Sequence, residues 1–177
     1  MISVDLDSTL NTLIYDWLEY INEREEKHYT INDIKCFDEP ILLKYIEYID
    51  DPNLYDHLGL LDGAIEFIKE LQKIDDVQIV SVTQDHHLKS KEKFVATHFP
   101  GVPLINVKDC KLAHTKNSWL IDDKLSNIKS HIEAGNGNGI VFTNGEYRYN
   151  DNSDYISMGD YGEIVKYIKM KQQQEQI

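Results

Sequence analysis

From residue 77 onward, short apolar stretches alternate with longer amphipathic ones, and this alternation is the strongest constraint on the fold. The short stretches have the length of buried strands, whereas the longer ones have the spacing of helices. The predicted strands cover residues 77–82, 103–107, 118–121 and 139–143, and the predicted helices cover 87–99, 124–134 and 161–174. Fully apolar strands that alternate with helices are typical of a parallel sheet covered on both faces. We therefore expect an α/β, Rossmann-like fold.

The first 60 residues depart from this alternation. A strand pattern covers 2–6, a helix pattern covers 12–26, and a second helical stretch lies near 41–49. The regular pattern resumes with a helix at 61–73 that begins around Asp62 and Gly63. We predict a core of residues 1–10 and 60–177, with a small helical unit at 11–59 inserted after the first strand. The turn-rich stretch 144–160 is predicted to be a loop.

The charge balance excludes two classes of partner. The chain has 18 Lys plus Arg against 31 Asp plus Glu, a formal net charge of −13. We expect neither a nucleic-acid polymer nor an anionic membrane as partner, because both are bound by basic surfaces. A small anionic substrate is compatible with this negative charge, since a few lysines and a cation can make one positive site. The sequence leaves the oligomeric state open.

Cysteine usage and hydropathy indicate the compartment. Cys36 and Cys110 are far apart and form no paired motif, so we expect reduced thiols. No apolar run approaches the roughly 20 residues of a membrane span. The first ten residues lack the basic region of a signal peptide. We therefore expect a cytoplasmic protein.

Acidic and hydroxyl-bearing residues gather where the predicted strands end. In open parallel sheets, ligands bind beyond the carboxyl ends of the strands. Several carboxylates in one crevice repel one another unless a divalent cation neutralises them, and ligands that are all oxygen suit Mg²⁺. A threonine hydroxyl and a lysine ammonium can then hold a phosphate beside that cation. The residues concerned are Asp5, Asp7, Thr83, Lys108, Lys111, Asp122 and Asp123.

The order of these residues resembles the four motifs of the haloacid dehalogenase (HAD) superfamily of phosphotransferases. Asp5-Leu6-Asp7-Ser8-Thr9 is similar to the first motif, D-x-D-x-T, and Thr83 after an apolar strand is similar to the second. Lys108 or Lys111 resembles the third motif, and Ile121-Asp122-Asp123 resembles the fourth. The resemblance covers residues 1–9 and 60–143. It implies a HAD-like fold and a phosphohydrolase, because the dehalogenases lack the second aspartate of the first motif.

The resemblance also implies a role for each residue. Asp5 is the nucleophile that forms a phosphoaspartyl intermediate. Asp7 protonates the leaving group and later deprotonates the attacking water. Mg²⁺ is held by Asp5, by the backbone carbonyl of Asp7, and by Asp122 or Asp123. Thr83 and Lys111, or Lys108 in place of Lys111, bind the remaining phosphate oxygens.

The predicted insertion narrows the resemblance to one family. A small helical unit between the first two motifs has the position of a C1 cap, and it is large enough to close over a small molecule. The cap, its aromatic residues and the run Leu60-Leu61-Asp62-Gly63-Ala64 resemble the 5′(3′)-deoxyribonucleotidases. The sequence departs from that family at Ser8, where glycine is frequent, and at Gln84, where Ser-Pro is usual. A nucleoside monophosphate is the implied substrate, and the candidate substrate-binding residues are Tyr20, Phe37, Tyr45, Tyr48, Gln84, Lys91, Lys93 and Lys108.

Two other functions are compatible with these motifs. Asp5-Leu6-Asp7-Ser8-Thr9-Leu10 also resembles the signature of protein phosphatases of the C-terminal-domain small phosphatase type, although the helical insertion and the Asp122-Asp123 pair do not. A non-enzymatic binding module on the same fold has no need for such a set of acids. Plainer roles compete as well. His86 and His87 are expected at the surface, and one of the aspartates at 122 and 123 is expected to cap the next helix.

Overall fold

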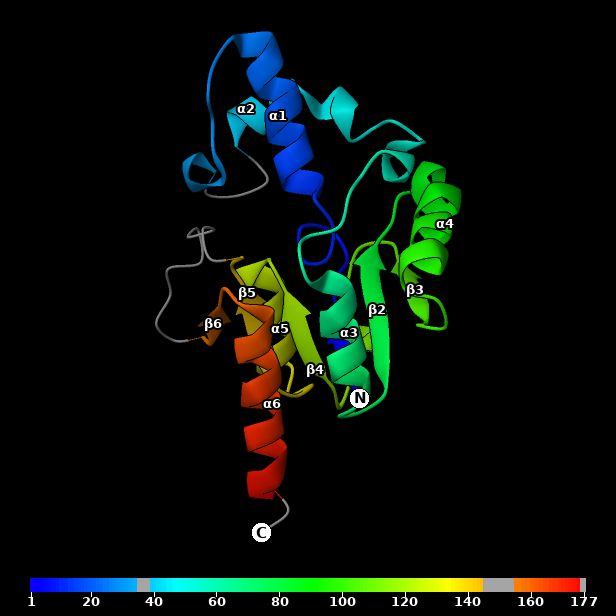
Figure 1. Cartoon of the computed structure of the whole chain (residues 1–177), viewed down its shortest axis with the longest axis vertical. Helices are drawn as coiled ribbons and strands as arrows, with labels where there is room; N and C mark the ends of the chain where they lie inside the picture. Colours follow the sequence, from blue (N-terminus) through cyan, green and yellow to red (C-terminus); the bar gives the residue numbers. More distant parts are fainter. Residues whose placement is uncertain (35–38, 145–154, 176–177) are drawn as a thin grey trace.

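The structure is a computed structural model that describes residues 1–34, 39–144 and 155–175. Within these residues, six parallel strands form one sheet in the order β3-β2-β1-β4-β5-β6 (Figure 1). The expected Rossmann-like α/β sheet is therefore confirmed. The strands are β1 (Ile2–Val4), β2 (Val77–Val82), β3 (Leu104–Val107), β4 (Trp119–Asp122), β5 (Gly139–Phe142) and β6 (Ser157–Met158).

Helices cover both faces of this sheet. Helices α3, α4 and α6 share one apolar cluster with β1, β2, β4 and β5, whereas α5 packs on the opposite face against Leu120 and Val141. The inner strands β1, β2, β4 and β5 are mainly apolar because both of their faces are buried, whereas β6 at the edge of the sheet is partly exposed. The helices are α1 (Leu13–Glu25), α2 (Pro40–Lys44), α3 (Ala64–Gln72), α4 (Leu88–His98), α5 (Leu125–Glu133) and α6 (Tyr161–Glu175).

The segment between β1 and α3 stands beyond the carboxyl ends of the strands (Figure 1). An antiparallel bridge between Asn11 and Leu60 joins its two ends, so the chain leaves the core and returns at one place. Inside the segment, Trp17, Ile21 and Leu42 belong to an apolar cluster separate from the one under the sheet. We call residues 11–59 the helical segment.

Two predicted elements differ in the structure. The helix expected near 41–49 ends as α2 at Lys44, and a 3₁₀ turn, η2 (Ile46–Tyr48), follows. The Tyr45 N–H donates to the Leu42 carbonyl at 3.0 Å and the Tyr48 N–H to the Tyr45 carbonyl at 3.1 Å, three residues back in each case, which is the pattern of a 3₁₀ turn. The Trp17 indole N–H also donates to the Tyr45 carbonyl at 3.0 Å. Within the loop expected at 144–160, β6 pairs with β5 over two residues, too few to leave a periodic pattern. Among the described residues, no helix is long and apolar enough to cross a membrane.

The packing of α6 predicts unequal effects for two residues of that helix. Ile168 is fully buried in the main apolar cluster, whereas Met170 is 44% exposed. Ile168→Ala should lower the free energy of unfolding by about 2–5 kcal/mol, because it leaves a cavity. Met170→Ala, the matched control, should change it by less than about 0.5 kcal/mol. Urea unfolding measures both, and equal losses would contradict the packing described.

Candidate active site

A pocket of about 330 Å³ lies between the strand ends and the helical segment. Its floor includes Asp5 and Asp7, which follow β1, and Lys111, which follows β3. Its roof comes from the helical segment and is mainly apolar: Trp17, Leu43, Ile46, Ile49, Leu54 and Tyr55. The pocket therefore joins a charged floor to an apolar roof at the edge of the sheet where ligands of parallel-sheet proteins bind.

Three carboxylates converge on the floor. Asp5, Asp122 and Asp123 are all buried, and one carboxylate oxygen of each lies within 4.8 Å of the others. The strand pairing brings them together, because the Asp5 N–H donates to the carbonyl of Ile121 at 2.8 Å and so aligns the ends of β1 and β4. The Asp123 N–H donates to the Thr9 hydroxyl at 3.1 Å. The oxygen atoms offered by this set fit a hard divalent cation.

Lys111 supplies positive charge to this cluster. Its buried ammonium donates to the carboxylates of Asp5 and Asp122, at 2.7 Å in the second case. Burial acts to lower the pKa of Lys111, but Asp122 and Asp5 outweigh burial and raise it. One ammonium does not balance three buried carboxylates. Burial raises the pKa of Asp5 to about 6. Lys111 opposes this rise, whereas the carboxylates of Asp122 and Asp7 add to it.

Asp123 shows the same imbalance. Burial and then the neighbouring Asp122 and Asp5 raise the pKa of Asp123 well above its usual value. A divalent cation among these carboxylates would lower both raised pKa values, because it favours the ionised forms. The cluster can therefore hold a metal ion, as expected for this edge of the sheet.

Asp7 lies in the opposite environment. Lys91 donates to its Oδ2 at 2.9 Å, and Asn11 donates to its Oδ1 at 3.0 Å. The Tyr55 hydroxyl lies 2.9 and 3.0 Å from the two oxygens, and Ser81 lies 3.3 Å from Oδ2. Burial acts to raise the pKa of Asp7, but Lys91 and these hydrogen bonds lower it below its usual value. The two aspartates of the first motif thus differ in electrostatic environment.

Ser8, which lies between Asp7 and Thr9 in the first motif, has a left-handed backbone. Its φ is +60°, a conformation that glycine adopts without steric cost. The Ser8 N–H donates to the side-chain oxygen of Asn11 at 3.0 Å, which holds the tight turn. Asp7, the residue before this turn, is paired with Lys91, whereas Asp5 is paired with Lys111.

The four predicted lysines fall into two groups in the structure, two buried and two exposed. Lys111 and Lys91 are buried at the site, the first beside Asp5 and the second beside Asp7. Lys108 and Lys93 are exposed and form ion pairs with Asp85 and Asp56. Of the two lysines left open for the third motif, the structure therefore brings Lys111 to the acidic cluster.

The remaining polar candidates lie near β2 and β4. The Thr83 hydroxyl donates to the Asn106 side chain at 2.8 Å and is buried at the end of β2, and Gln84 lines the pocket. Asp122 accepts the Lys124 backbone N–H at 2.9 Å, so it is the aspartate that contacts the start of α5. Its second oxygen also contacts Lys111, which leaves Asp122 shared between the helix and the cluster.

The predicted aromatic residues Tyr20, Tyr45 and Tyr48 are not among the residues that line the pocket. Tyr20 packs against Tyr48 with ring centroids 4.9 Å apart, and Tyr45 donates to Glu25. Phe37 lies outside the described residues. The pocket instead contains Trp17 and Tyr55. Pattern alone did not single out Tyr55, because the short 3₁₀ turn that carries it has no helical spacing to read.

The prediction that His87 lies at the surface is wrong. Its side chain is buried and packs edge-on against Tyr55, with ring centroids 5.7 Å apart. The 3₁₀ turn η4 (Asp85–His87) turns this residue inward, whereas His86 stays exposed. Burial, His86 and Lys91 lower the pKa of His87, so a neutral imidazole lines the pocket at neutral pH.

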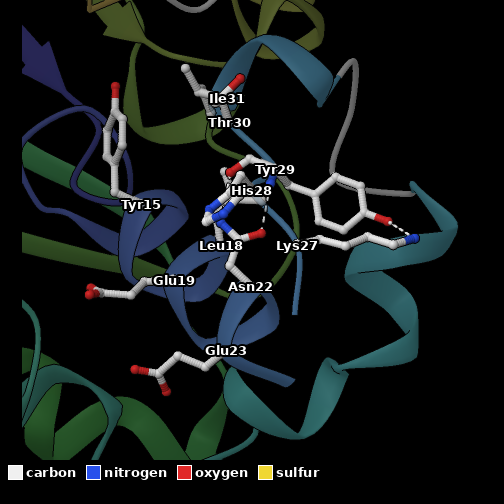
Figure 2. Close-up of a pocket in the computed structure, with 10 residues that line it drawn as sticks. All are labelled: Tyr15, Leu18, Glu19, Asn22, Glu23, Lys27, His28, Tyr29, Thr30 and Ile31. Carbon is white, nitrogen blue, oxygen red and sulfur yellow. Dashed lines mark hydrogen bonds between the residues drawn. The ribbon is translucent and has the colours of Figure 1, made fainter. Parts of the chain in front are cut away.

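A larger hollow of about 550 Å³ lies on another side of α1 (Figure 2). Leu18, Asn22 and Tyr29 line it, and Asn22 accepts the Tyr29 N–H at 2.7 Å. Its lining contains no member of the acidic cluster and no lysine of the strand ends. Volume alone does not identify a reactive site, so we place the candidate active site at the strand ends.

Comparison with known proteins identifies the family of this chain. Residues 1–173 match the family described as 5′ nucleotidase, deoxy (Pyrimidine), cytosolic type C protein. A 5′(3′)-deoxyribonucleotidase of Bacillus subtilis (strain 168) is 30% identical over 139 residues, which cover 73% of this chain and 79% of that protein. A 5′(3′)-deoxyribonucleotidase of Clostridium acetobutylicum is 29% identical over 147 residues, 80% of each chain.

Solved structures show the same fold. A HAD-superfamily hydrolase from Ehrlichia chaffeensis superposes with a TM-score of 0.52 at 20% identity, over 96% of this chain and 95% of that one. A HAD hydrolase from Bacillus subtilis, solved bound to magnesium, gives a TM-score of 0.61 at 17% identity, over 94% and 96%. The fold of the chain is that of these HAD hydrolases. The chain belongs to the 5′ nucleotidase, deoxy (Pyrimidine), cytosolic type C family, a family of phosphomonoester hydrolases.

Proposed function

We propose that this chain is a Mg²⁺-dependent phosphatase that hydrolyses a (deoxy)nucleoside monophosphate through a phosphoaspartyl intermediate on Asp5. One observation carries the proposal: Asp5 and Asp7, two residues apart, have different partners and oppositely shifted pKa values. Carboxyl groups whose environments differ in this way can take different chemical roles. Asp5 lies in the acidic cluster that can hold a cation, and Asp7 lies beside it with its own donors.

Asp5, Asp122 and Asp123 are the side chains that would hold the magnesium ion, together with the backbone carbonyl of Asp7. The raised pKa values of Asp5 and Asp123 support this assignment, because burial and the neighbouring carboxylates disfavour their ionised forms and a divalent cation there would favour them. When bound, Mg²⁺ supplies charge neutralisation for the phosphoryl oxygens and favours the ionised nucleophile. Lys111 adds one positive charge on the same side of the pocket.

The reaction then proceeds in two steps. An Asp5 carboxylate oxygen forms a bond to phosphorus while the ester bond between phosphorus and the leaving oxygen breaks, and Asp7 gives that oxygen a proton. Water next attacks phosphorus and Asp7 takes its proton, so that inorganic phosphate leaves and the Asp5 carboxylate is restored. Asp7 is ionised in the free protein, and an incoming phosphate dianion raises its pKa by repulsion, which makes the acid form accessible.

The position of the helical segment favours a small substrate. We propose that residues 11–59 act as a cap over residues 1–10 and 60–177. The pocket volume of about 330 Å³ suits a small molecule, and apolar side chains of the segment lie over the charged floor. A nucleoside monophosphate matches this arrangement, with its phosphate at Asp5 and its nucleoside beneath Trp17 and Ile46. We further propose the cytoplasm as its compartment, in keeping with the family's description.

The raised pKa of Asp5 predicts that magnesium binding releases protons. Near pH 6, Asp5 is about half protonated without metal, since its pKa is about 6. Binding requires the ionised form, so Mg²⁺ affinity should fall as pH falls through about 6. Calorimetry at one pH in two buffers of different ionisation enthalpy measures the released protons, and Asp5→Asn should release fewer. Binding without proton release and with pH-independent affinity would contradict the site.

The two aspartates should respond differently to amide substitution. Asp5→Asn removes the nucleophile, so neither phosphoenzyme nor product should form. Asp7→Asn keeps the backbone carbonyl for the metal but loses the proton donor, so kcat should fall by about 10²- to 10⁴-fold. Steady-state rates with an alkyl phosphate ester in Mg²⁺ and in excess chelator measure both effects. Near-normal turnover by Asp5→Asn, or by the wild-type chain in chelator, would refute the mechanism.

The apolar roof predicts a preference among phosphate esters. On a panel of nucleoside monophosphates, an aryl phosphate and a phosphoserine peptide, kcat/KM should be highest for a nucleoside monophosphate. Ile46→Ala should raise its KM about tenfold through a lost apolar contact, with little change for the aryl phosphate. Ile132→Ala is the control, because Ile132 is similarly exposed (38% against 39%) but lies on α5. A phosphopeptide that proves the best substrate would replace the nucleotidase with a protein phosphatase.

A further inference from the structure

Tyr55 connects the helical segment directly to Asp7. It lies on the 3₁₀ turn η3 (Leu54–Asp56), outside the sheet, and its side chain is buried. Its hydroxyl lies 2.9 Å from Oδ1 and 3.0 Å from Oδ2 of Asp7, so one O–H donor is shared by both oxygens. Both residues line the pocket, whereas the other donors to Asp7 are absent from its described lining. Tyr55 is therefore the donor that meets Asp7 on the substrate side.

Helix α4 fixes the position of the Tyr55 ring. The ammonium of Lys91 lies 4.7 Å from the ring centroid, and the Phe94 ring packs edge-on at 6.1 Å. Lys91 also donates to Asp7, so the aromatic ring, the ammonium and the carboxylate form one closed set of contacts. A tyrosine held on both its face and its edge by one helix has little freedom to turn its hydroxyl away.

The turn that carries Tyr55 is itself attached to α4. The Ser90 hydroxyl donates to the Pro52 carbonyl at 2.8 Å, and Lys93 forms an ion pair with Asp56 at 2.8 Å. These two contacts lie on either side of Tyr55 in the sequence. The contact between the hydroxyl and Asp7 therefore depends on the docking of residues 52–56 against α4.

We propose that Tyr55 is a positioning residue that orients the Asp7 carboxyl group for proton transfer to the leaving oxygen of the substrate. The inference rests on the proposed phosphatase function. While one Asp7 oxygen gives up its proton, the shared hydroxyl stays bonded to the other oxygen and keeps the carboxyl plane fixed. Without that hydroxyl, Lys91, Asn11 and Ser81 still hold the charge of Asp7, but the contact on the pocket side is lost.

Leaving-group dependence separates this role from simple packing. An acidic phenol leaves without a proton, whereas an alkoxide needs one from Asp7. Tyr55→Phe removes only the hydroxyl oxygen and keeps the ring contacts with α4. It should lower kcat/KM, which reports the step that releases the leaving group, by about tenfold or more for an alkyl phosphate, part of the range for general acid catalysis. For p-nitrophenyl phosphate the change in kcat/KM should be less than about twofold, so the plot of log kcat/KM against leaving-group pKa becomes steeper.

Two comparisons complete the experiment. Tyr29→Phe is the matched control, because it also removes one hydroxyl contact in the helical segment, with Lys27 at 3.2 Å, far from Asp7; its leaving-group plot should equal that of the wild type. In an Asp7→Asn background, Tyr55→Phe should add no further loss for the alkyl ester, since the acid is already gone. Urea unfolding of every variant checks that the chain is folded.

Each outcome decides the inference. A steeper plot for Tyr55→Phe, absent in Tyr29→Phe and not additive with Asp7→Asn, supports it. An unchanged plot, an equal loss for all esters, or additive losses in the double variant would overturn it while leaving the phosphatase function intact. If Tyr55→Phe does not fold, Ser90→Ala serves as the second variant: loosening residues 52–56 should steepen the plot in the same direction, and an unchanged plot overturns the inference. A wild-type chain that hydrolyses no phosphate ester would overturn both proposals.

Discussion

The concentration of buried negative charge at the ends of β1 and β4 is the constraint on which the rest of this structure depends. Asp5, Asp122 and Asp123 meet there because parallel pairing aligns the carboxyl ends of adjacent strands. Desolvation makes such a cluster costly, and Lys111 compensates only part of the charge. The protein therefore keeps a site that favours a cation, and Asp7 lies beside this cluster with partners of its own.

The contacts of Asp7 link the sheet to the helical segment. Asp7 receives its charge partner from α4 through Lys91 and a further donor from the helical segment through Tyr55. The same helix holds the turn that carries Tyr55, by way of Ser90. The acid of the proposed reaction is thus set by contacts between three parts of the chain, whereas the nucleophile is set by strand pairing and by its contact with Lys111.

Apolar periodicity was enough to predict the sheet, because strands buried on both faces leave continuous apolar runs that helices do not share. It missed β6, whose two residues pair with β5 without any pattern, and it extended α2 past Lys44, where the backbone bonds change to those of a 3₁₀ turn. The spacing of the motif predicted that Asp5 and Asp122 would share one edge of the sheet. It could not predict the burial of His87 or the role of Tyr55, since both depend on short 3₁₀ turns whose direction is fixed by tertiary contacts.

The central claim is that Asp5 itself carries the phosphoryl group, and chemical trapping tests it most directly. The wild-type chain is mixed with Mg²⁺ and a nucleoside monophosphate, quenched within the first turnover, and treated with borohydride, which reduces an acyl phosphate to an alcohol. Peptide mass spectrometry should then find homoserine in place of aspartate at position 5 and nowhere else. Turnover with an unmodified Asp5, or with the modification at another carboxylate, would contradict the account.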